Sequence, residues 1–229
     1  MSFKKNKYAV IKQAISLELA SFIADYFRMQ KQVYDTCRKE RYISPFEELI
    51  GFYETEKDLI PNSYAHYANI AMETLMLKCK PVMEKATGLK LYPAYTYARI
   101  YKKDDALRRH KDRFSCEIST TMNLGGDDWP IYLEPSGKKG MKGVKIDLKP
   151  GDMLIYRGIE LEHWREKFKG KECVQVFLHY NDSKTLGAKD NIFDKRLHLG
   201  LPSFFKRWYI LIMDAVDTTI PPTASFIRI

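Results

Sequence analysis

The sequence has little histidine and cysteine, with only five and four of them among 229 residues. The cysteines are far apart and form no Cys-x-x-Cys pair: Cys37, Cys79, Cys116 and Cys173. This pattern favours reduced thiols over a disulfide framework. Residues 1–7 are polar and lack the apolar region of a secretory signal peptide. We therefore expect a soluble, cytoplasmic protein.

Long apolar runs and long runs of one charge are also missing. The apolar-rich stretch from Phe204 to Val216 is interrupted by Lys206, Arg207 and Asp214, and it is too short to span a bilayer. The net charge of +9 is spread along the chain, which is typical of a solvated basic surface. Because a basic protein attracts anions, the charge favours an anionic substrate and leaves nucleic acid among the partners it allows.

The first ninety residues have helical periodicity. Ser16 is a plausible N-cap for a helix that extends to about Cys37. A second helix is expected from Asn62 to Ala86, with a kink or restart at Pro81 and a C-cap at Gly88. Between the two helices, residues 42–61 are expected to form a loop.

From residue 89 onward the pattern changes to short strands separated by turns. The expected strands are Tyr95–Tyr101, Ser115–Leu124, Pro130–Leu133, Gly143–Leu148, Met153–Arg157 and Cys173–Tyr180. Short strands after helices indicate an α+β sandwich or barrel that helices brace. We expect a single domain, with mainly helical support in 1–88, a catalytic core in 89–182 and a C-terminal extension with one short helix in 183–229.

Three side chains form a candidate metal site. His110 and Asp112 are two residues apart, so on an extended chain their side chains point the same way. His163 follows a turn and a strand and could supply a third ligand. Two imidazoles and one carboxylate are typical of the facial triad of non-haem Fe(II) oxygenases, which leaves positions for a 2-oxo acid and O2. A zinc hydrolase could use the same residue types with Glu117 or Glu162 as general base.

The chain resembles the 2-oxoglutarate/Fe(II)-dependent dioxygenase superfamily, in the prolyl 4-hydroxylase-like branch and its bacterial and marine-phage members. The motifs that carry the resemblance are Tyr97–Tyr101, His110–Glu117, Pro150–Gly158, Glu162–Arg165 and Gln175–Tyr180. The resemblance implies a double-stranded β-helix, a jelly-roll or cupin-like core, whose open mouth holds the iron. It also implies oxidative decarboxylation of 2-oxoglutarate to succinate and CO2, with hydroxylation of a substrate.

The sequence departs from the family at one position. The family usually places an Arg or Lys nine to eleven residues after the second histidine, to hold the distal carboxylate of 2-oxoglutarate, and here those positions are Glu172, Cys173 and Val174. Another group must then compensate that buried charge. The candidates from sequence are Arg165, which lies two residues beyond His163, together with Arg99, Lys171, Tyr101 and Gln175.

Several other side chains have candidate roles near the triad. A ligating histidine normally donates its second N–H to a carboxylate or carbonyl, and Glu117, Asn123 and Thr121 are the residues expected to accept. Arg113 is expected to pair with Asp112 or to reach substrate. The remaining candidates are His179, expected to line the pocket, and Trp164, expected to pack as a wall.

Three functions remain open from the sequence. The first is a hydroxylase that uses Fe(II) and 2-oxoglutarate on a small molecule or peptide, the second is a cupin-like iron enzyme without a 2-oxo acid, and the third is a non-catalytic jelly-roll binding module. The intact triad favours the first.

Overall fold

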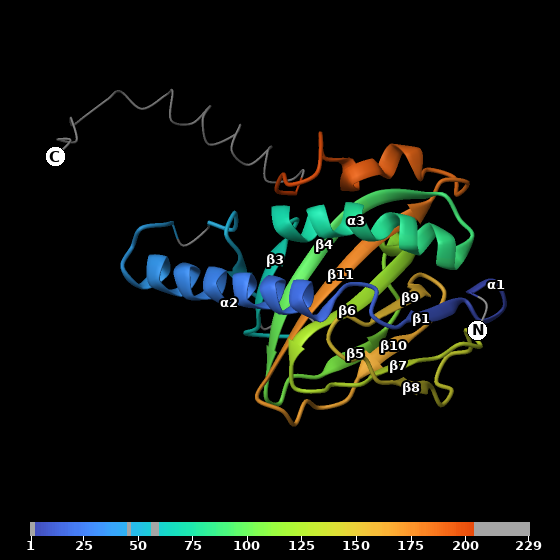
Figure 1. Ribbon diagram of the computed structural model, residues 1–229, viewed down its shortest axis with the longest axis horizontal. Coiled ribbons are helices and arrows are strands. Elements are labelled where there is room, and N and C mark those ends of the chain that lie inside the picture. The colour runs from blue at the N-terminus through green and yellow to red at the C-terminus, as the bar shows by residue number, and fades with distance from the viewer. Residues whose placement is uncertain (1–2, 45–46, 56–59, 204–229) are drawn as a thin grey trace.

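A computed structural model of the protein describes residues 3–44, 47–55 and 60–203 (Figure 1). The helices are α1 (Phe3–Asn6), α2 (Leu17–Lys39), α3 (Ile70–Thr87) and the 3-10 segments η1 (Phe114–Cys116) and η2 (Lys189–Lys195). The strands are β1 (Tyr8–Ile11), β2 (Phe52–Tyr53), β3 (Tyr64–Tyr67), β4 (Leu91–Lys102), β5 (Leu107–His110), β6 (Ile118–Gly126), β7 (Ile131–Leu133), β8 (Val144–Ile146), β9 (Met153–Arg157), β10 (His163–Arg165) and β11 (Glu172–Asp182). Phe204–Val216, and most of the expected C-terminal extension, lie outside the described residues.

The strands form two antiparallel sheets. The larger sheet has seven strands in the order β1-β9-β6-β11-β4-β3-β2, and the smaller has four in the order β5-β10-β7-β8. Apolar side chains of both sheets, among them Ile131 and Leu154, pack into one cluster between the layers. This is the sandwich of a jelly roll, which the pattern of short strands predicts.

Helices α2 and α3 lie across the outer face of the larger sheet (Figure 1). Alternation along β4 explains both of its faces: Ala98 and Ile100 pack with the helices in one core cluster, while Tyr97, Arg99 and Tyr101 line a pocket between the sheets. The helices therefore cover one face of the sheet and leave the other for the site.

Helix α2, the first of the two expected helices, begins as expected, because Ser16 accepts a hydrogen bond from the Leu19 N–H at 3.1 Å. It ends at Lys39, close to the expected end at Cys37. The second expected helix is wrong at its start. Residues Tyr64–Tyr67 form β3, and α3 begins only at Ile70, after Asn69 accepts hydrogen bonds from the first-turn N–H groups. Pairing of β3 with β4 overrides the local helical periodicity.

The end of α3 is as expected, with Gly88 in the left-handed conformation at φ 73°. Helix α3 continues through Pro81, so the helix does not restart there. Pro81 is exposed, so the carbonyl that its missing N–H leaves unpaired lies on the solvent side of the helix.

All six expected strands are present. Met153–Arg157 has the predicted ends, the other five have shifted ends, and the expected strand at residues 115–124 begins only at Ile118, after the 3-10 turn η1. Residues 1–88 also contribute β1, β2 and β3 to the larger sheet. The four cysteines form no disulfide. Among the described residues, no helix has the length and apolar composition that crossing a membrane requires.

Candidate metal site and pocket

Two short strands that the sequence pattern did not predict bring the candidate metal ligands together. Strand β10 pairs with β5 so that His163 lies opposite His110, with the ring centroids 4.2 Å apart. Asp112 follows β5, and its Oδ1 lies 3.7 Å from His110 Nε2 and 3.5 Å from His163 Nε2. The three ligand atoms lie within 4.8 Å of one another, which suits donors that each approach a shared ion at about 2 Å.

Backbone carbonyls orient the two imidazoles. His110 Nδ1 lies 2.7 Å from the carbonyl oxygen of Arg108, and His163 Nδ1 lies 3.2 Å from that of Leu161. Donation of Nδ1–H to these oxygens leaves each Nε2 as the ligand atom. These carbonyls take the place that we expected for side chains of β6.

The three side chains expected in that role have other partners. Glu117 accepts from the Asp182 N–H and from Thr185 Oγ1. Asn123 donates to the Leu148 carbonyl, and Thr121 contacts Gln175. Glu162 pairs with Arg109 at 2.6 Å. Neither Glu117 nor Glu162, the two glutamates that a zinc hydrolase could use, lines the pocket.

Asp112 is held in position by its neighbours. Ser119 Oγ donates to Asp112 Oδ2 at 2.8 Å, and the Asp112 N–H donates to the Gly158 carbonyl at 2.9 Å. A side chain at Gly158 would collide with Asp112 Oδ2 and with the Cys116 carbonyl. Glycine is therefore required at residue 158 for the carboxylate to lie where it does.

The charge state of the triad suits a divalent cation. Burial would raise the pKa of Asp112, but the neighbouring His163 outweighs burial and lowers that pKa to about 2. Burial, followed by the proximity of His163, lowers the pKa of His110. One carboxylate and a neutral imidazole require no deprotonation before a metal binds at neutral pH. This donor set fits Fe(II).

The triad opens into a pocket of about 280 Å³. Its walls carry aromatic rings and one arginine, including Tyr97, Arg99, Tyr101, Tyr156 and His179. The Tyr101 hydroxyl makes no hydrogen bond within the described part of the chain, and burial raises the pKa of this tyrosine. It is therefore a neutral donor available to a ligand, as expected for Tyr101.

Arg165 does not line this pocket but interacts with the wall residues Tyr101 and Tyr156, and it is buried with 2% of its surface exposed. Its Nη atoms donate to the Trp129 carbonyl, to Thr121 Oγ1 at 3.1 Å and to Gln175 Oε1 at 3.3 Å, but its Nε has no partner. No carboxylate pairs with it among residues 3–44, 47–55 and 60–203. Burial lowers the pKa of the guanidinium, since no carboxylate offsets the loss of hydration. This cation therefore lacks the anion that normally accompanies a buried charge.

The other residues expected to hold 2-oxoglutarate lie in different surroundings. Arg99 lines the pocket, but it already pairs with the Glu54 carboxylate. Gln175 is buried beside Arg165 rather than on the pocket wall. Lys171 is exposed at a bend before β11, and its N–H donates to Asp127. Of the candidate cations, only Arg165 is buried near the triad without a protein carboxylate.

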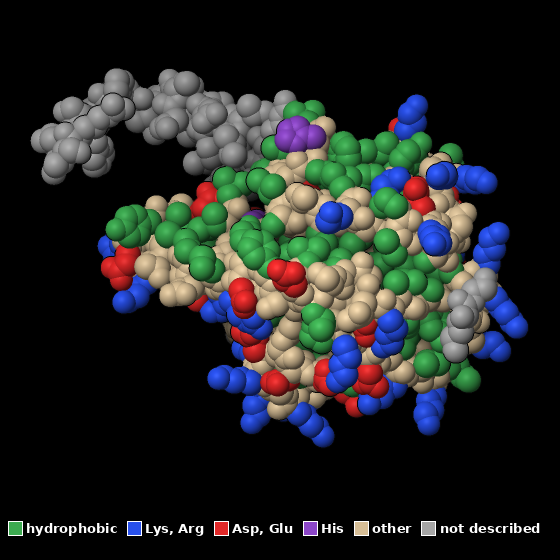
Figure 2. Space-filling view, viewed as in Figure 1, with side chains coloured by type: hydrophobic (Ala, Val, Ile, Leu, Met, Phe, Trp, Pro, Cys, Tyr) green, Lys and Arg blue, Asp and Glu red, His purple; other side chains and the backbone are tan. Residues whose placement is uncertain are grey.

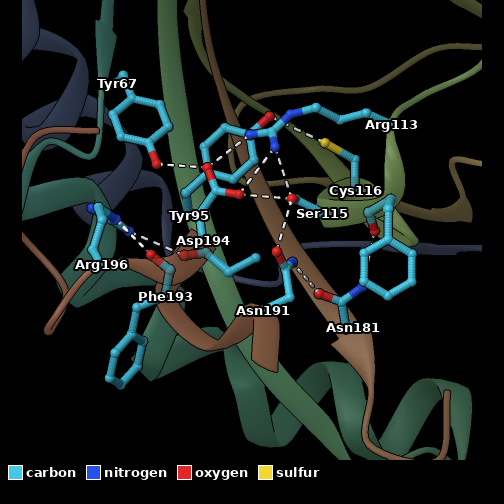
Figure 3. A network of polar contacts seen from close by, with 12 residues as sticks. Tyr67, Tyr95, Arg113, Ser115, Cys116, Asn181, Asn191, Phe193, Asp194 and Arg196 are labelled. Atoms are coloured by element: carbon cyan, nitrogen blue, oxygen red, sulfur yellow. Dashed lines mark hydrogen bonds and ion pairs between the residues drawn. The ribbon is translucent and has the colours of Figure 1, made fainter. Parts of the chain in front are cut away.

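Arg113 does not pair with Asp112. Its guanidinium forms two hydrogen bonds with Asp194 of η2, at 3.0 and 2.8 Å, and lies over the Tyr95 ring. Asp194 also accepts from Ser115 Oγ at 2.6 Å and from the Tyr67 hydroxyl at 2.7 Å (Figure 3). This network connects the 3-10 segment η2 to the segment that carries Asp112.

His179 lies on the pocket wall, where it was expected, and its Nδ1 contacts Ser119 Oγ at 2.9 Å. Trp164, expected as a wall, does not line this pocket; it is half-buried and stacks on Tyr132 with an angle of 12° between the rings. Sequence reasoning missed Ser119, Glu54 and Asp194; Ser119 alone had a signal, since it shares a face of β6 with the candidate Thr121.

Solved structures provide the comparison, since no family model and no curated protein matches this sequence at a significant level. A prolyl-4-hydroxylase of Pseudomonas putida superposes with a TM-score of 0.54 at 13% identity, over 79% of this chain and 95% of that one. The 2-oxoglutarate-dependent epimerase SnoN of nogalamycin biosynthesis gives a TM-score of 0.60 at 10% identity, over 87% and 91%. A Trichoplax adhaerens prolyl hydroxylase in complex with a hypoxia-inducible-factor peptide gives 0.55 at 13%, over 80% and 86%.

At these identities the likeness shows the fold. The chain has the double-stranded β-helix of the 2-oxoglutarate/Fe(II) oxygenases, prolyl hydroxylases among them. The expected α+β class and the double-stranded β-helix fold are confirmed.

Proposed function

We propose that the protein is an Fe(II)- and 2-oxoglutarate-dependent oxygenase that hydroxylates an organic substrate. The observation that carries the proposal is the buried Arg165, a cation without a protein carboxylate, two residues along β10 from His163. A dicarboxylate co-substrate would supply the missing anion. The triad beside it supplies ligands for the metal on which this chemistry depends.

His110, Asp112 and His163 would hold Fe(II), and the bound iron would supply the activation of O2. The carbonyls of Arg108 and Leu161 keep both Nε2 atoms directed at the metal. Ser119 binds one carboxylate oxygen of Asp112 and leaves the other for the ion. These contacts fix the ligands before the metal arrives.

Arg165 would hold the distal carboxylate of 2-oxoglutarate through a charge-assisted pair, and the Tyr101 hydroxyl would donate a further hydrogen bond. Neighbouring Thr121 and Gln175 fix the guanidinium by accepting from the same Nη2 atom. The overall reaction converts 2-oxoglutarate, O2 and a C–H bond to succinate, CO2 and a hydroxyl group. One oxygen atom of O2 enters succinate and the other enters the product.

The test is an anaerobic titration of the full chain with Fe(II) and 2-oxoglutarate, followed through the visible metal-to-ligand charge-transfer band. We expect the band in the wild type and in Arg109→Gln, a matched control on the neighbouring strand β5. We expect no band in His163→Ala because that protein loses a ligand.

Iron binding without a band would overturn the proposal in favour of a cupin-like iron enzyme that uses no 2-oxo acid. Absence of iron binding would favour the non-catalytic binding module. Formation of succinate from 2-oxoglutarate under air, dependent on His110, completes the positive result.

A further inference from the structure

A second cavity, of about 610 Å³, adjoins the metal pocket. Tyr97 lines both spaces, so the two meet at this residue. Residues of α2, β3 and the start of α3 form the other walls, together with Glu48–Ile50, Phe52, Gly200, Pro202 and Ser203. The volume lies in the range of sites that enclose a small molecule or a large side chain.

The walls of this cavity are rich in aromatic rings. Tyr26, Phe52, Tyr67 and Tyr97 contribute the rings, and Ile70 lies at the rim with 69% of its surface exposed. Phe52 meets Tyr97 edge to face, with the centroids 6.2 Å apart and an angle of 71°. Tyr67 stacks on Tyr95 at 5.0 Å, and Tyr95 belongs to the metal pocket. Ring contacts therefore continue from this cavity toward the triad.

The polar groups of the cavity form one uncharged network. Gln30 Nε2 donates to His66 Nδ1 at 2.6 Å, and Asn69 Nδ2 donates to Gln30 Oε1 at 2.7 Å and to the Tyr26 hydroxyl at 3.0 Å. Burial lowers the pKa of His66 to about 4, so the imidazole is neutral at physiological pH. The network offers hydrogen bonds but no positive charge.

The described lysines and arginines do not line this cavity. The sequence has 38 Lys and Arg residues, and Figure 2 shows many of their side chains spread over the visible surface, with acidic ones among them. Within the described ranges, no Lys or Arg lines the cavity. The one acidic side chain on its described walls is Glu48, and His66 is neutral. Arg99 and Arg196 lie over the cavity rings of Tyr97 and Tyr67, but Glu54 and Glu73 compensate their charges. The described residues therefore give this cavity no uncompensated cation.

We infer that this cavity binds the body of the substrate, and that the substrate part held there is uncharged or cationic and carries an aromatic or extended apolar group. The inference rests on the proposed function, because it identifies the cavity beside Tyr97 as the substrate site of the same centre. A buried phosphate or carboxylate would meet no uncompensated cation among the described residues here and would be disfavoured. Tyrosine and phenylalanine faces attract cations and pack against apolar groups.

The test uses three probes that share a benzyl or phenyl ring and differ in charge: benzyltrimethylammonium, benzyl alcohol and benzenesulfonate. Their binding to the full chain is measured by ligand-observed NMR titration. We expect benzyltrimethylammonium to bind at least about 10-fold more tightly than benzenesulfonate, a difference of about 1.4 kcal/mol. Benzyl alcohol should lie between them. Equal binding of all three, preference for the sulfonate or binding of none would overturn the inference.

A substitution at the rim makes the test sensitive to location. Ile70→Lys places a cation at the cavity and should reverse the order, so that benzenesulfonate binds best. Leu77→Lys is the matched control, because Leu77 lies two turns further along α3, is half exposed and does not line the cavity. The inference is wrong if both lysine variants change the order equally, since the probes would then respond to overall charge.

The charge-transfer band separates this inference from the proposed function. Ile70→Lys should leave the band with Fe(II) and 2-oxoglutarate unchanged, because Ile70 is outside the metal pocket. A band together with the wrong probe order refutes the substrate class alone. The expected probe order without a band refutes the oxygenase and leaves the cavity as a binding site.

Discussion

Two arginines near the same pocket lie in opposite electrostatic surroundings. Arg99 on β4 pairs with the Glu54 carboxylate, whereas Arg165 on β10 has only neutral partners among the described residues. The pKa values of the two guanidinium groups also shift in opposite directions. Burial lowers the pKa of both, but Tyr101, Tyr97 and Glu54 outweigh it at Arg99 and raise that pKa, while at Arg165 the net change is downward.

The comparison distinguishes a structural cation from one available to a ligand. A buried charge with a protein partner is already compensated, so Arg99 holds β4 and the segment after β2 together. Arg165 is fixed in place by Trp129, Thr121 and Gln175 and still lacks an anion. Arg113, which follows the ligand Asp112 in sequence, resembles Arg99 because Asp194 compensates its charge.

Breaking the Arg99–Glu54 pair should give the largest effect. Arg99→Met alone leaves Glu54 buried without its cation, and we expect the free energy of unfolding to fall by about 3 to 5 kcal/mol. Arg99→Met combined with Glu54→Leu should recover most of that loss. Urea unfolding of the three proteins measures both values, and a double variant no more stable than the single one would show that the pair is not the cause.

Removing the other arginine should affect the ligand rather than the fold. Arg165→Gln should weaken 2-oxoglutarate binding by about 100-fold, since losing one partner of a buried charged pair costs about 3 kcal/mol. Without ligand, its free energy of unfolding should change by less than about 1 kcal/mol, because no protein ion pair is lost. Calorimetric titration and urea unfolding test the two halves, and a large stability loss with unchanged affinity would reverse the roles of the two arginines.

Weakening the Arg113–Asp194 pair should have an intermediate effect, on the affinity for the metal. Asp194→Asn weakens the hold on Arg113, which directly follows the ligand Asp112, and we expect Fe(II) affinity to fall about 10-fold, as for other outer-sphere partners. Asp190→Asn in the same 3-10 segment is the control. Anaerobic Fe(II) titration measures the change, and equal affinities in the wild type and both variants would assign the pair to folding alone.

The smallest effect concerns pH. Burial would raise the pKa of Asp194, but hydrogen bonds from Arg113 and Ser115 outweigh it and lower that pKa to about 2 from 3.8. The carboxylate therefore contributes stability that is fully present above pH 3.8 and is lost as the pH falls through 2. Because Arg113 is half exposed, solvent screening reduces the contribution to about 1 kcal/mol. The stability difference between wild type and Asp194→Asn should shrink between pH 5 and pH 2, and a constant difference would contradict this assignment.

Local sequence patterns predicted the elements whose signals are local. Ser16 and Gly88 mark helix ends through their own side chain and backbone conformation. The start of α3 could not be predicted in this way, because residues 64–67 have helical spacing and become a strand only by pairing with β4. Strands β5 and β10 are too short for any periodicity to reveal, yet their register places His110 opposite His163.

The candidate ligands followed from residue type and spacing, but their supporting contacts did not. The carbonyls of Arg108 and Leu161 orient the imidazoles, and a carbonyl has no signature in sequence. Net charge likewise suggested an anionic substrate, whereas the cavity beside Tyr97 lacks a described Lys or Arg. The net charge is a sum over the whole chain and does not indicate where each charged side chain lies.

The sequence by itself determined the chemistry that could be assembled: two imidazoles and a carboxylate at the right spacing, helices before strands, and several candidate cations. Only the tertiary structure decided which cation has no carboxylate partner, and which cavity has no lining Lys or Arg, within residues 3–44, 47–55 and 60–203. Ion pairing and burial depend on residues that are far apart in sequence, such as Glu54 with Arg99 and Asp194 with Arg113. Those pairs form only when the strands fold together, and for that reason local pattern cannot specify them.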